Sequence, residues 1–291
     1  MSSTLKRKFA VVGNPIAHSQ SPLIHQHFAE QCGVDLSYTR ELVENEPEAF
    51  HAFVDRFFQS GGKGLNVTVP FKEVAYNSCQ VLSEGARRAG AVNTLSIDSK
   101  GQLSGDNTDG PGLLYHLQSL LQWPVEGSCV LLLGAGGASR GVILPLLAAK
   151  PRRLIVWNRT ASKASNLVEA FQDEAIRYEV QLDALTASEL GDQPMTADII
   201  INATSSGLAN EVPAIPEACF SSSTQLYDML YAKDRNSQTP FLEWGTSLGI
   251  KQRADGLGML VSQAAYSFEL WNGHFPDIKQ TLSALSAKLQ S

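Results

Sequence analysis

The sequence predicts an α/β protein of two domains, and three observations support this. Short apolar runs alternate with helical patterns along most of the 291 residues, which is typical of strand–helix units and a parallel sheet. A glycine-rich turn directly follows the apolar run Cys129–Leu133. A polar, turn-rich segment at 101–112 separates two such blocks and is the candidate hinge between domains.

The first block is expected to hold strand–helix units of its own. Its strands are short apolar runs bounded by turn residues, and its helices carry apolar residues every three or four positions. Ser21 is a candidate helix cap, and Pro22 occupies the first helical position. In chain order we expect strand Phe9–Gly13, helix Pro22–Gln31, strand Leu36–Leu42, helix Glu46–Phe58 and strand Gly64–Val69.

The second block begins near Asp109. The run Cys129–Leu133 is fully apolar, as expected for a strand covered on both faces of a sheet. The two C-terminal helices can pack on either block. In chain order we expect strand Cys129–Leu133, helix Ala138–Ala149, strands Leu154–Trp157, Ala197–Ala203 and Gln225–Leu230, and helices Leu257–Trp271 and Asp277–Leu289.

Charge, apolar runs and cysteine spacing limit the kinds of molecule that the protein is expected to bind. The chain has 23 Lys and Arg against 29 Asp and Glu, a formal net charge of −6, which argues against nucleic acid and anionic membranes as partners. No apolar run reaches the roughly 18 residues of a membrane span, and the N-terminus lacks the apolar stretch of a signal peptide. The four cysteines are far apart, without a Cys-x-x-Cys pair, which predicts single thiols in a reducing compartment. We therefore expect a cytoplasmic protein with a small-molecule partner.

Two kinds of site are not expected. His25 and His27 are two apart on a predicted helix and so point to different faces, while the other histidines are isolated. No metal site is therefore predicted. A hydrolase site is likewise not expected, although Gly137–Gly141 has the Gly-x-Ser-x-Gly spacing found in the elbow of many hydrolases.

The segment Gly134–Ala138 has the context of a dinucleotide-binding turn. It follows a strand and opens a helix, where glycines let the backbone approach a pyrophosphate and the helix N-terminus offers free N–H groups. Ser139 stands where a third glycine or alanine is usual. The alternative is an ordinary tight turn between a strand and a helix.

The end of the next strand indicates which dinucleotide is bound. An NAD site generally has Asp or Glu there to bind the ribose hydroxyls, but this chain has Asn158 and Arg159, with Lys163 one helical turn further on. Arginine suits the extra 2′-phosphate of NADP. Between Gly127 and Val168 there are six basic residues and no acidic one. The alternative is a solvated basic helix start, but the charge pattern favours NADP.

Polar residues follow the strands of the first block. Ser19 and Ser21 precede a helix N-terminus and can form a cradle for a carboxylate, although Ser21 can equally be a simple helix cap. Asn66 and Thr68 are expected on one sheet face, and Lys72 lies at the carboxyl end of that strand, where ligands bind in α/β sheets. Taken alone, Lys72 could be a solvated surface lysine.

Together these segments resemble the shikimate dehydrogenase family, and specifically its NADP-dependent, shikimate-specific branch. The matching segments are GNPIAHSQSP, NVTVPFK, EGARRAGAVNT, GDNTDG, LLLGAGGASR, NRTASKA, NATSSG and DGLGMLVSQAA. The resemblance implies a substrate-binding and catalytic domain at 1–108, onto which the helices at 257–291 pack back. It also implies a Rossmann-type NADP-binding domain at 109–256 and a cleft between the two domains.

The resemblance also implies an activity, the reversible NADPH-dependent reduction of 3-dehydroshikimate to shikimate on the route to chorismate and the aromatic amino acids. Lys72 matches the family's catalytic lysine, paired with Asp109. Burial would favour the neutral amine and Asp109 the ammonium, and the residues leave that balance open. The substrate carboxylate is expected at Ser19, Ser21 and Tyr231, and the substrate hydroxyls at Thr68, Asn93, Asp109 and Gln263.

Cofactor contacts follow from the same resemblance. Met229 and Gly256 are expected near the nicotinamide. Glu84 matches a position sometimes found among cofactor contacts, although we expect it to be distant. The remaining matched positions are Gly134, Ala135, Gly136, Gly137, Ala138, Asn158, Arg159, Thr160, Ala161, Ser162 and Lys163.

One segment departs from the family pattern, because the loop 232–238 is longer than usual and makes the position of Tyr231 less certain. Two other functions stay open. One is a quinate/shikimate dehydrogenase with relaxed cofactor use, and the other is a non-catalytic NADP- or metabolite-sensing homologue. The presence of both Lys72 and Asp109 argues against the second. The sequence leaves a monomer and a homodimer equally open.

Overall fold

The chain folds into two compact units. The computed structural model describes residues 6–192, 196–232 and 237–288. The first unit runs to Gly112 and takes up Val261–Leu285 again, and the second is built on Leu113–Leu260. The division thus falls after Gly112 and within one C-terminal helix, where the sequence predicted boundaries at 108 and 256.

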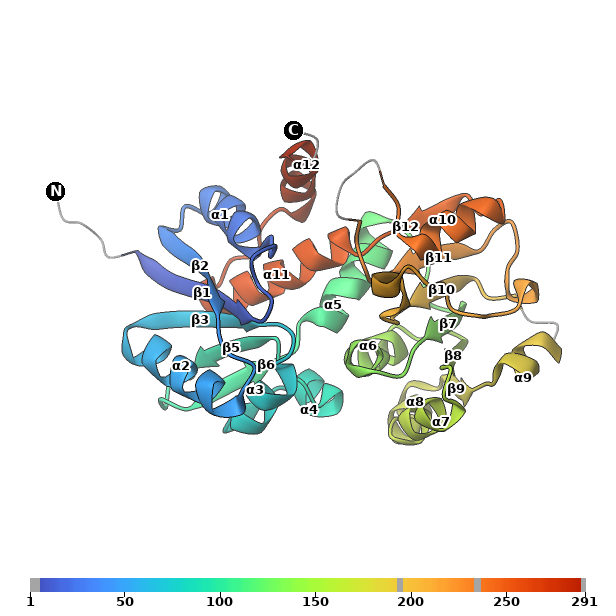
Figure 1. The fold of residues 1–291 in the computed structure, drawn as a ribbon, viewed down its shortest axis with the longest axis horizontal. Helices are drawn as coiled ribbons and strands as arrows, with labels where there is room; N and C mark the ends of the chain where they lie inside the picture. The colour runs from blue at the N-terminus through green and yellow to red at the C-terminus, as the bar shows by residue number, and fades with distance from the viewer. Residues whose placement is uncertain (1–5, 193–195, 233–236, 289–291) are drawn as a thin grey trace. The chain divides into compact units, whose positions relative to one another are not determined.

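The first unit contains a six-stranded sheet flanked by helices (Figure 1). Helices α5 and α11 continue into the second unit. The elements are β1 (Arg7–Gly13), α1 (Ser21–Cys32), β2 (Leu36–Leu42), α2 (Pro47–Gln59), β3 (Gly62–Val67), α3 (Lys72–Ser78), β4 (Val81–Leu82), α4 (Glu84–Ala89), β5 (Thr94–Ile97), β6 (Leu103–Asp106), α5 (Asp109–Leu114), α11 (Leu257–Asn272) and α12 (Ile278–Lys288).

Strand β1 is buried on both faces, which explains its continuous apolar sequence. Ala10 and Val12 join the core that α2 covers with Phe50, Val54 and Phe57. On the opposite face the ring of Phe9 stacks on that of Trp271 from α11, with 5.1 Å between centroids. Helices therefore cover both sides of this sheet.

The first sheet is mixed, whereas the sequence predicted a parallel one. Its order is β2-β1-β3-β5-β6-β4, and β5 pairs antiparallel with both β3 and β6. Strand β6 lies inside the predicted hinge 101–112, so the turn-rich reading was wrong there. Gly105 is required by packing, because a Cβ on it would lie 2.6 Å from Cys79 Sγ.

Two local expectations also need correction. The cap position of α1 is Gln20, and no side chain caps this helix. Ser21 is its first helical residue, so it is not the cap. Strand β3 ends at Val67, and Thr68 starts a turn in which the N–H of Phe71 donates to its carbonyl at 3.0 Å. Val69 is therefore 61% exposed and does not continue the buried face.

The second unit has a six-stranded sheet with helices on both faces (Figure 1). A π-helix, η1 (Tyr115–Leu120), follows α5. The remaining elements are β7 (Cys129–Leu133), α6 (Gly137–Ala148), β8 (Arg153–Trp157), α7 (Ala161–Glu169), α8 (Gln172–Tyr178), β9 (Gln181–Ala184), α9 (Ala187–Asp192), β10 (Ile199–Asn202), η2 (Ser206–Ala209), η3 (Glu217–Cys219), β11 (Gln225–Asp228), α10 (Pro240–Ser247) and β12 (Gln252–Ala254).

This second sheet confirms the predicted Rossmann-type domain. Its order is β12-β11-β10-β7-β8-β9, and all adjacent pairs are parallel. The chain thus starts in the middle and winds outward twice, reversing between β7 and β10, the point at which ligands bind in such sheets. Alternate residues of β7 face two separate cores, Val130 with the α6 side and Leu131 with the α10 side.

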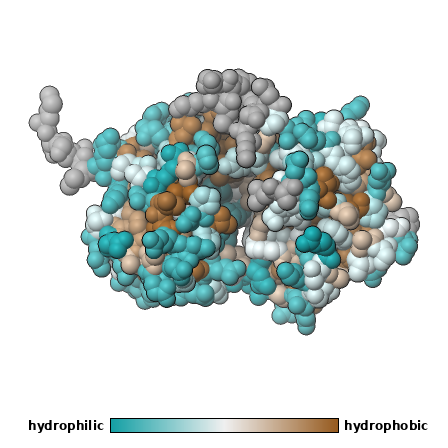
Figure 2. All heavy atoms as spheres, viewed as in Figure 1, coloured by the Kyte–Doolittle hydropathy of each residue, from teal (hydrophilic) through white to brown (hydrophobic). Residues whose placement is uncertain are grey.

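The surface of each unit mixes polar and apolar residues, as Figure 2 shows for one face. Such a mixture is normal for a folded domain in water. Across 6–192, 196–232 and 237–288, no helix combines the length and apolar character needed to cross a membrane.

Candidate active site

Lys72 and Asp109 form a short ion pair in the first unit. The Nζ of Lys72 lies 2.6 Å from Oδ2 of Asp109, with the two side chains 30% and 18% exposed. Asp109 Oδ1 accepts from Asn93 Nδ2 at 2.8 Å, so each carboxylate oxygen has its own donor. The ammonium is therefore held in one place by a carboxylate that is itself fixed.

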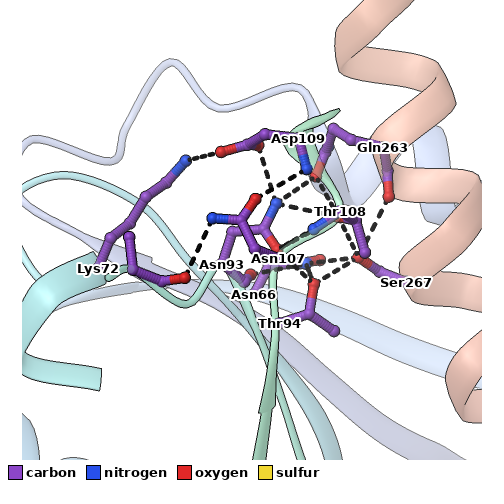
Figure 3. Close-up of polar contacts among 10 residues, drawn as sticks. Asn66, Lys72, Asn93, Thr94, Asn107, Thr108, Asp109, Gln263 and Ser267 are labelled. Atoms are coloured by element: carbon purple, nitrogen blue, oxygen red, sulfur yellow. Dashed lines mark hydrogen bonds and ion pairs between the residues drawn. The ribbon is translucent and has the colours of Figure 1, made fainter. Parts of the chain in front are cut away.

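Asn93 contacts Asp109 directly and links it to Gln263 and to the buried hydroxyl of Thr108, as Figure 3 shows. Asn93 Nδ2 also donates to Thr108 Oγ1 at 2.9 Å and lies 3.3 Å from Gln263 Oε1. The backbone N–H of Thr108 donates back to Asn93 Oδ1 at 2.9 Å. Four predicted site residues (Lys72, Asn93, Asp109 and Gln263) are thus brought together from four segments separated in sequence.

The predicted carboxylate cradle lies at the start of α1. Ser19 Oγ donates to Ser21 Oγ at 3.2 Å and accepts from the Ser21 backbone N–H at 3.3 Å. Ser21 is buried, and Ser19 is half-buried. Thr68 lies in the turn after β3 and packs beside Gly13, where a Cβ would come within 2.4 Å of its methyl group. No described contact joins Ser19, Ser21 or Thr68 directly to Lys72.

Sequence reasoning missed several residues that support this site. Asn66 Oδ1 accepts from Tyr38 Oη at 2.6 Å, and its amide nitrogen donates to the carbonyl of Asn93 at 3.1 Å. Burial raises the pKa of Tyr38 well above its usual value, so the phenol keeps the proton that it donates. The sequence placed Asn66 only as a polar residue on one face of a strand. Tyr38 comes from the edge strand β2, and no sequence signal links the two residues.

The glycine turn of the second unit has the backbone geometry expected for it. Gly134 has φ = +110°, a conformation that favours glycine, and its N–H donates to the Trp157 carbonyl at 2.7 Å. Gly136 is the cap position of α6, and a Cβ on Gly136 or Gly137 would meet no atom within 4 Å. No side chain or backbone atom therefore crowds the start of α6, where the first N–H groups of a helix have no partner within the helix.

A cavity of about 950 Å³ lies at this turn, between the ends of β7, β8 and β10. It is lined by Gly134–Ala138 and by all the predicted residues from Asn158 to Lys163 except Ser162. It is also lined by Thr186, Ala187, Glu211 and the segment Ala203–Ser206. That last segment belongs to the quoted motif NATSSG, to which sequence reasoning gave no role.

Met229 and Gly256 are neighbours at another edge of the second unit. A Cβ on Gly256 would lie 2.2 Å from the Met229 carbonyl oxygen, and the Gly256 N–H donates to Leu230 at 2.9 Å. Neither residue lines the cavity at the glycine turn. Tyr231 is 38% exposed, and burial raises the pKa of its hydroxyl. Most of the loop 232–238 lies outside the described residues.

Glu84 is the first residue of α4 in the first unit, whereas the cavity at the glycine turn lies in the second unit.

Asp228, next to Met229, is fully buried. Its Oδ1 accepts from the Leu230 N–H at 3.1 Å, and its Oδ2 accepts from Thr239 Oγ1 at 2.6 Å. Burial is the main cause that raises the pKa of Asp228 to about 6.

The parallel sheet, the glycine turn and the basic strand end define the second unit as a dinucleotide-binding domain. With the lysine–aspartate site of the first unit, they define a two-domain oxidoreductase. Three family descriptions match in order, namely the shikimate dehydrogenase substrate binding domain at residues 11–95, shikimate / quinate 5-dehydrogenase at 117–211, and the shikimate 5′-dehydrogenase C-terminal domain at 256–285. The chain belongs to the shikimate dehydrogenase family.

Individual relatives agree over the whole length. The chain is 47% identical to a shikimate dehydrogenase (NADP(+)) of Aromatoleum aromaticum, covering 97% of this chain and 98% of that one. An Ael1 enzyme from Pseudomonas putida superposes with a TM-score of 0.88 and 36% identity, covering 97% and 98% of the two chains. Shikimate 5-dehydrogenase from Thermus thermophilus, in complex with NADP(H) and shikimate, has a TM-score of 0.80 and 32% identity, covering 97% and 99%.

Proposed function

We propose that the chain catalyses the reversible NADP-dependent reduction of 3-dehydroshikimate to shikimate. The observation that carries this is the Lys72–Asp109 ion pair, in which both carboxylate oxygens are held by donors. The relative from Aromatoleum aromaticum, named for this activity, supports it. We assign most substrate contacts to the first unit and most cofactor contacts to the second, with Tyr231 and Glu84 as the exceptions.

Lys72 is the proton donor and acceptor in this proposal. Reduction of a ketone puts negative charge on its oxygen, which an ammonium can stabilise and protonate. Asp109 Oδ2 holds the Lys72 Nζ in position, and Asn93 prevents the carboxylate from turning away. In the oxidation direction the neutral amine takes the proton from the hydroxyl group of shikimate.

The substrate's other groups are assigned to the remaining polar residues. Ser19 and Ser21 bind the carboxylate with their hydroxyls near the start of α1, and Tyr231 contributes a hydroxyl to the same carboxylate. Thr68, Asn93, Asp109 and Gln263 bind the ring hydroxyls. Amide, hydroxyl and carboxylate groups are suited to a polyhydroxylated acid because they supply both donors and acceptors.

The cavity of the second unit suits NADP in size and in chemistry. The free N–H groups at Gly136–Ala138 suit a pyrophosphate, and the exposed Arg159 with Lys163 suits a 2′-phosphate. Met229 and Gly256 are assigned to the nicotinamide end, and Glu84 and Ser162 remain assigned from the family match alone. The nicotinamide, when bound, supplies or accepts the hydride.

The deciding experiment is a spectrophotometric assay of shikimate-dependent NADP reduction, repeated with quinate and with NAD. We expect strong activity only when shikimate is combined with NADP, and weak activity with quinate or with NAD. Comparable activity with quinate or NAD would favour a relaxed quinate/shikimate dehydrogenase. Absence of turnover despite binding of NADP would favour a sensing homologue.

We place the protein in the cytoplasm, because its four cysteines are free, as is usual in a reducing compartment. Its small-molecule partners are shikimate and NADP. Sedimentation velocity would decide between a monomer and a homodimer.

A further inference from the structure

The hydroxyl of Ser267 lies at the junction of the buried polar groups behind Asn93 (Figure 3). Ser267 is on α11, one helical turn after Gln263, and is fully buried. Its Oγ lies 2.7 Å from Thr94 Oγ1, 3.0 Å from Asn66 Nδ2 and 3.3 Å from Thr108 Oγ1. It also lies 3.2 Å from the carbonyl of Gln263. None of the roles proposed above uses this residue.

Counting protons gives these contacts a direction. A serine hydroxyl has one proton to donate and two lone pairs. Thr94 Oγ1 donates to Asn93 Oδ1 at 2.9 Å, so its own proton is in use. Two acceptors remain for the single Ser267 proton, Thr94 Oγ1 at 2.7 Å and the Gln263 carbonyl at 3.2 Å, and we assign it to the shorter contact. Ser267 accepts from Asn66 Nδ2.

The resulting chain of hydrogen bonds runs from Ser267 through Thr94 to Asn93. With its oxygen facing Thr94, Asn93 turns its amide nitrogen toward Asp109 Oδ1, at 2.8 Å. A flipped amide would instead place its oxygen against the carboxylate, which is repulsive. The backbone N–H of Thr108 supports the same orientation, so Ser267 contributes part of this preference.

We propose that Ser267 is a positioning residue for the substrate site, acting through Thr94 and Asn93 on the carboxylate that holds Lys72. The inference rests on the proposed function. Ser267 touches none of the reacting atoms. It acts by increasing the fraction of molecules in which the side-chain amides of Asn93 and Gln263 are oriented to bind the substrate. It also ties α11, which carries Gln263, to β3 and β5 through Asn66 and Thr94.

The test is Ser267→Ala, which removes the hydroxyl without adding volume. We expect kcat/KM for shikimate to fall about tenfold, the scale of one lost buried hydrogen bond with its partners left short of a donor. KM for NADP should stay within twofold of the wild-type value. The dissociation constant of shikimate, measured by calorimetry without cofactor, should rise in parallel.

Thr94→Val breaks the same chain at its next link and should produce a similar loss. The double variant should lose little more than either single variant, because both changes interrupt one chain. Thr281→Val is the matched control. Thr281 is fully buried in the same unit and its hydroxyl accepts from Gln31 Nε2 at 2.9 Å, so this variant loses a buried hydrogen bond away from the chain.

The outcomes are distinct. If the wild type is active and Ser267→Ala or Thr94→Val keeps kcat/KM for shikimate within twofold, the positioning role is overturned and the proposed function stands. A loss equal to that of Thr281→Val, or one shared by shikimate and NADP, also overturns it. If the wild type itself does not oxidise shikimate with NADP, the proposed function fails and this inference with it. Additive losses in the double variant would contradict the single chain.

Discussion

Lys72 and Asp109 are each the first residue of a helix, and their side chains meet at 2.6 Å. The N-terminal end of a helix disfavours a cation and favours an anion. Asp109 therefore sits where its charge is stabilised, and it supplies the counter-charge that Lys72 needs at the start of α3. This pair fixes the position of the one group proposed to transfer a proton.

Replacing Lys72 tests that assignment. Lys72→Ala should lower kcat about 10²-fold or more, the usual contribution of general acid–base catalysis, with a smaller change in KM for shikimate. Steady-state kinetics in both directions provides the measurement. A rise in KM with kcat unchanged would make Lys72 a binding residue only.

Lys63 offers a matched control for this variant. It is an exposed lysine of β3, the strand that precedes Lys72. Lys63→Ala changes the net charge by the same amount, so kcat should stay within twofold of the wild-type value. Equal losses in the two variants would point to bulk charge instead of the Lys72–Asp109 pair.

Arg159→Ala should separate the two nicotinamide cofactors. Arg159 is exposed and lines the cavity at the glycine turn, where its guanidinium suits a phosphate dianion. Loss of charge-assisted hydrogen bonds should lower kcat/KM for NADP about 10- to 100-fold. The value for NAD, which lacks the 2′-phosphate, should change little.

The control for this variant is Arg152→Ala. Arg152 is exposed just before β8, whereas Arg159 follows the other end of that strand. Cofactor preference should be unchanged. If the wild type already prefers NAD, or if Arg159→Ala affects both cofactors alike, the NADP assignment is wrong.

The parts of the fold that depend on local pattern could be predicted from the sequence. Strand Cys129–Leu133 was predicted to the residue, because an apolar run followed by a glycine turn admits one reading. The network behind Asn93 could not be predicted. Ser267, Thr94 and Tyr38 come from α11, β5 and β2, and only the fold brings such hydroxyls together. Gly105 contributed to the wrong turn prediction in 101–112, because in a sequence a glycine needed for close packing looks the same as one needed for a turn.

Gly112 provides a test of how α5 and α11 support the site. A Cβ on Gly112 would lie 2.7 Å from the backbone nitrogen of Gln263, so Gly112→Ala must push α11 away. We expect a loss of about 1–3 kcal/mol in the free energy of unfolding, the usual cost of overpacking. KM for shikimate should rise because Gln263 is displaced. Urea denaturation and steady-state kinetics measure the two effects.

Gly85→Ala is the corresponding control in the same unit. Its Cβ would meet only ordinary contacts, the nearest being the Asn107 carbonyl oxygen at 3.7 Å. Within helix α4, alanine should stabilise by about 0.5–1 kcal/mol relative to glycine. If Gly112→Ala were as stable and as active as Gly85→Ala, the close approach of α5 and α11 would not constrain the site.

Asp228 predicts a pH dependence of stability that runs against that of most carboxylates. Burial raises its pKa from near 3.8 to about 6, so between those values the folded protein keeps a proton that the unfolded chain releases. Its contribution to the free energy of unfolding therefore falls by about 3 kcal/mol as pH rises from 4 to 6, and is constant above that. In Asp228→Asn the oxygen still accepts from the Leu230 N–H, and the titration is gone. Urea denaturation of both proteins at pH 4.5, 5.5 and 7 should show wild type losing stability relative to the variant as pH rises. A difference that is independent of pH, or one of opposite sign, would show that Asp228 is already ionised throughout this range.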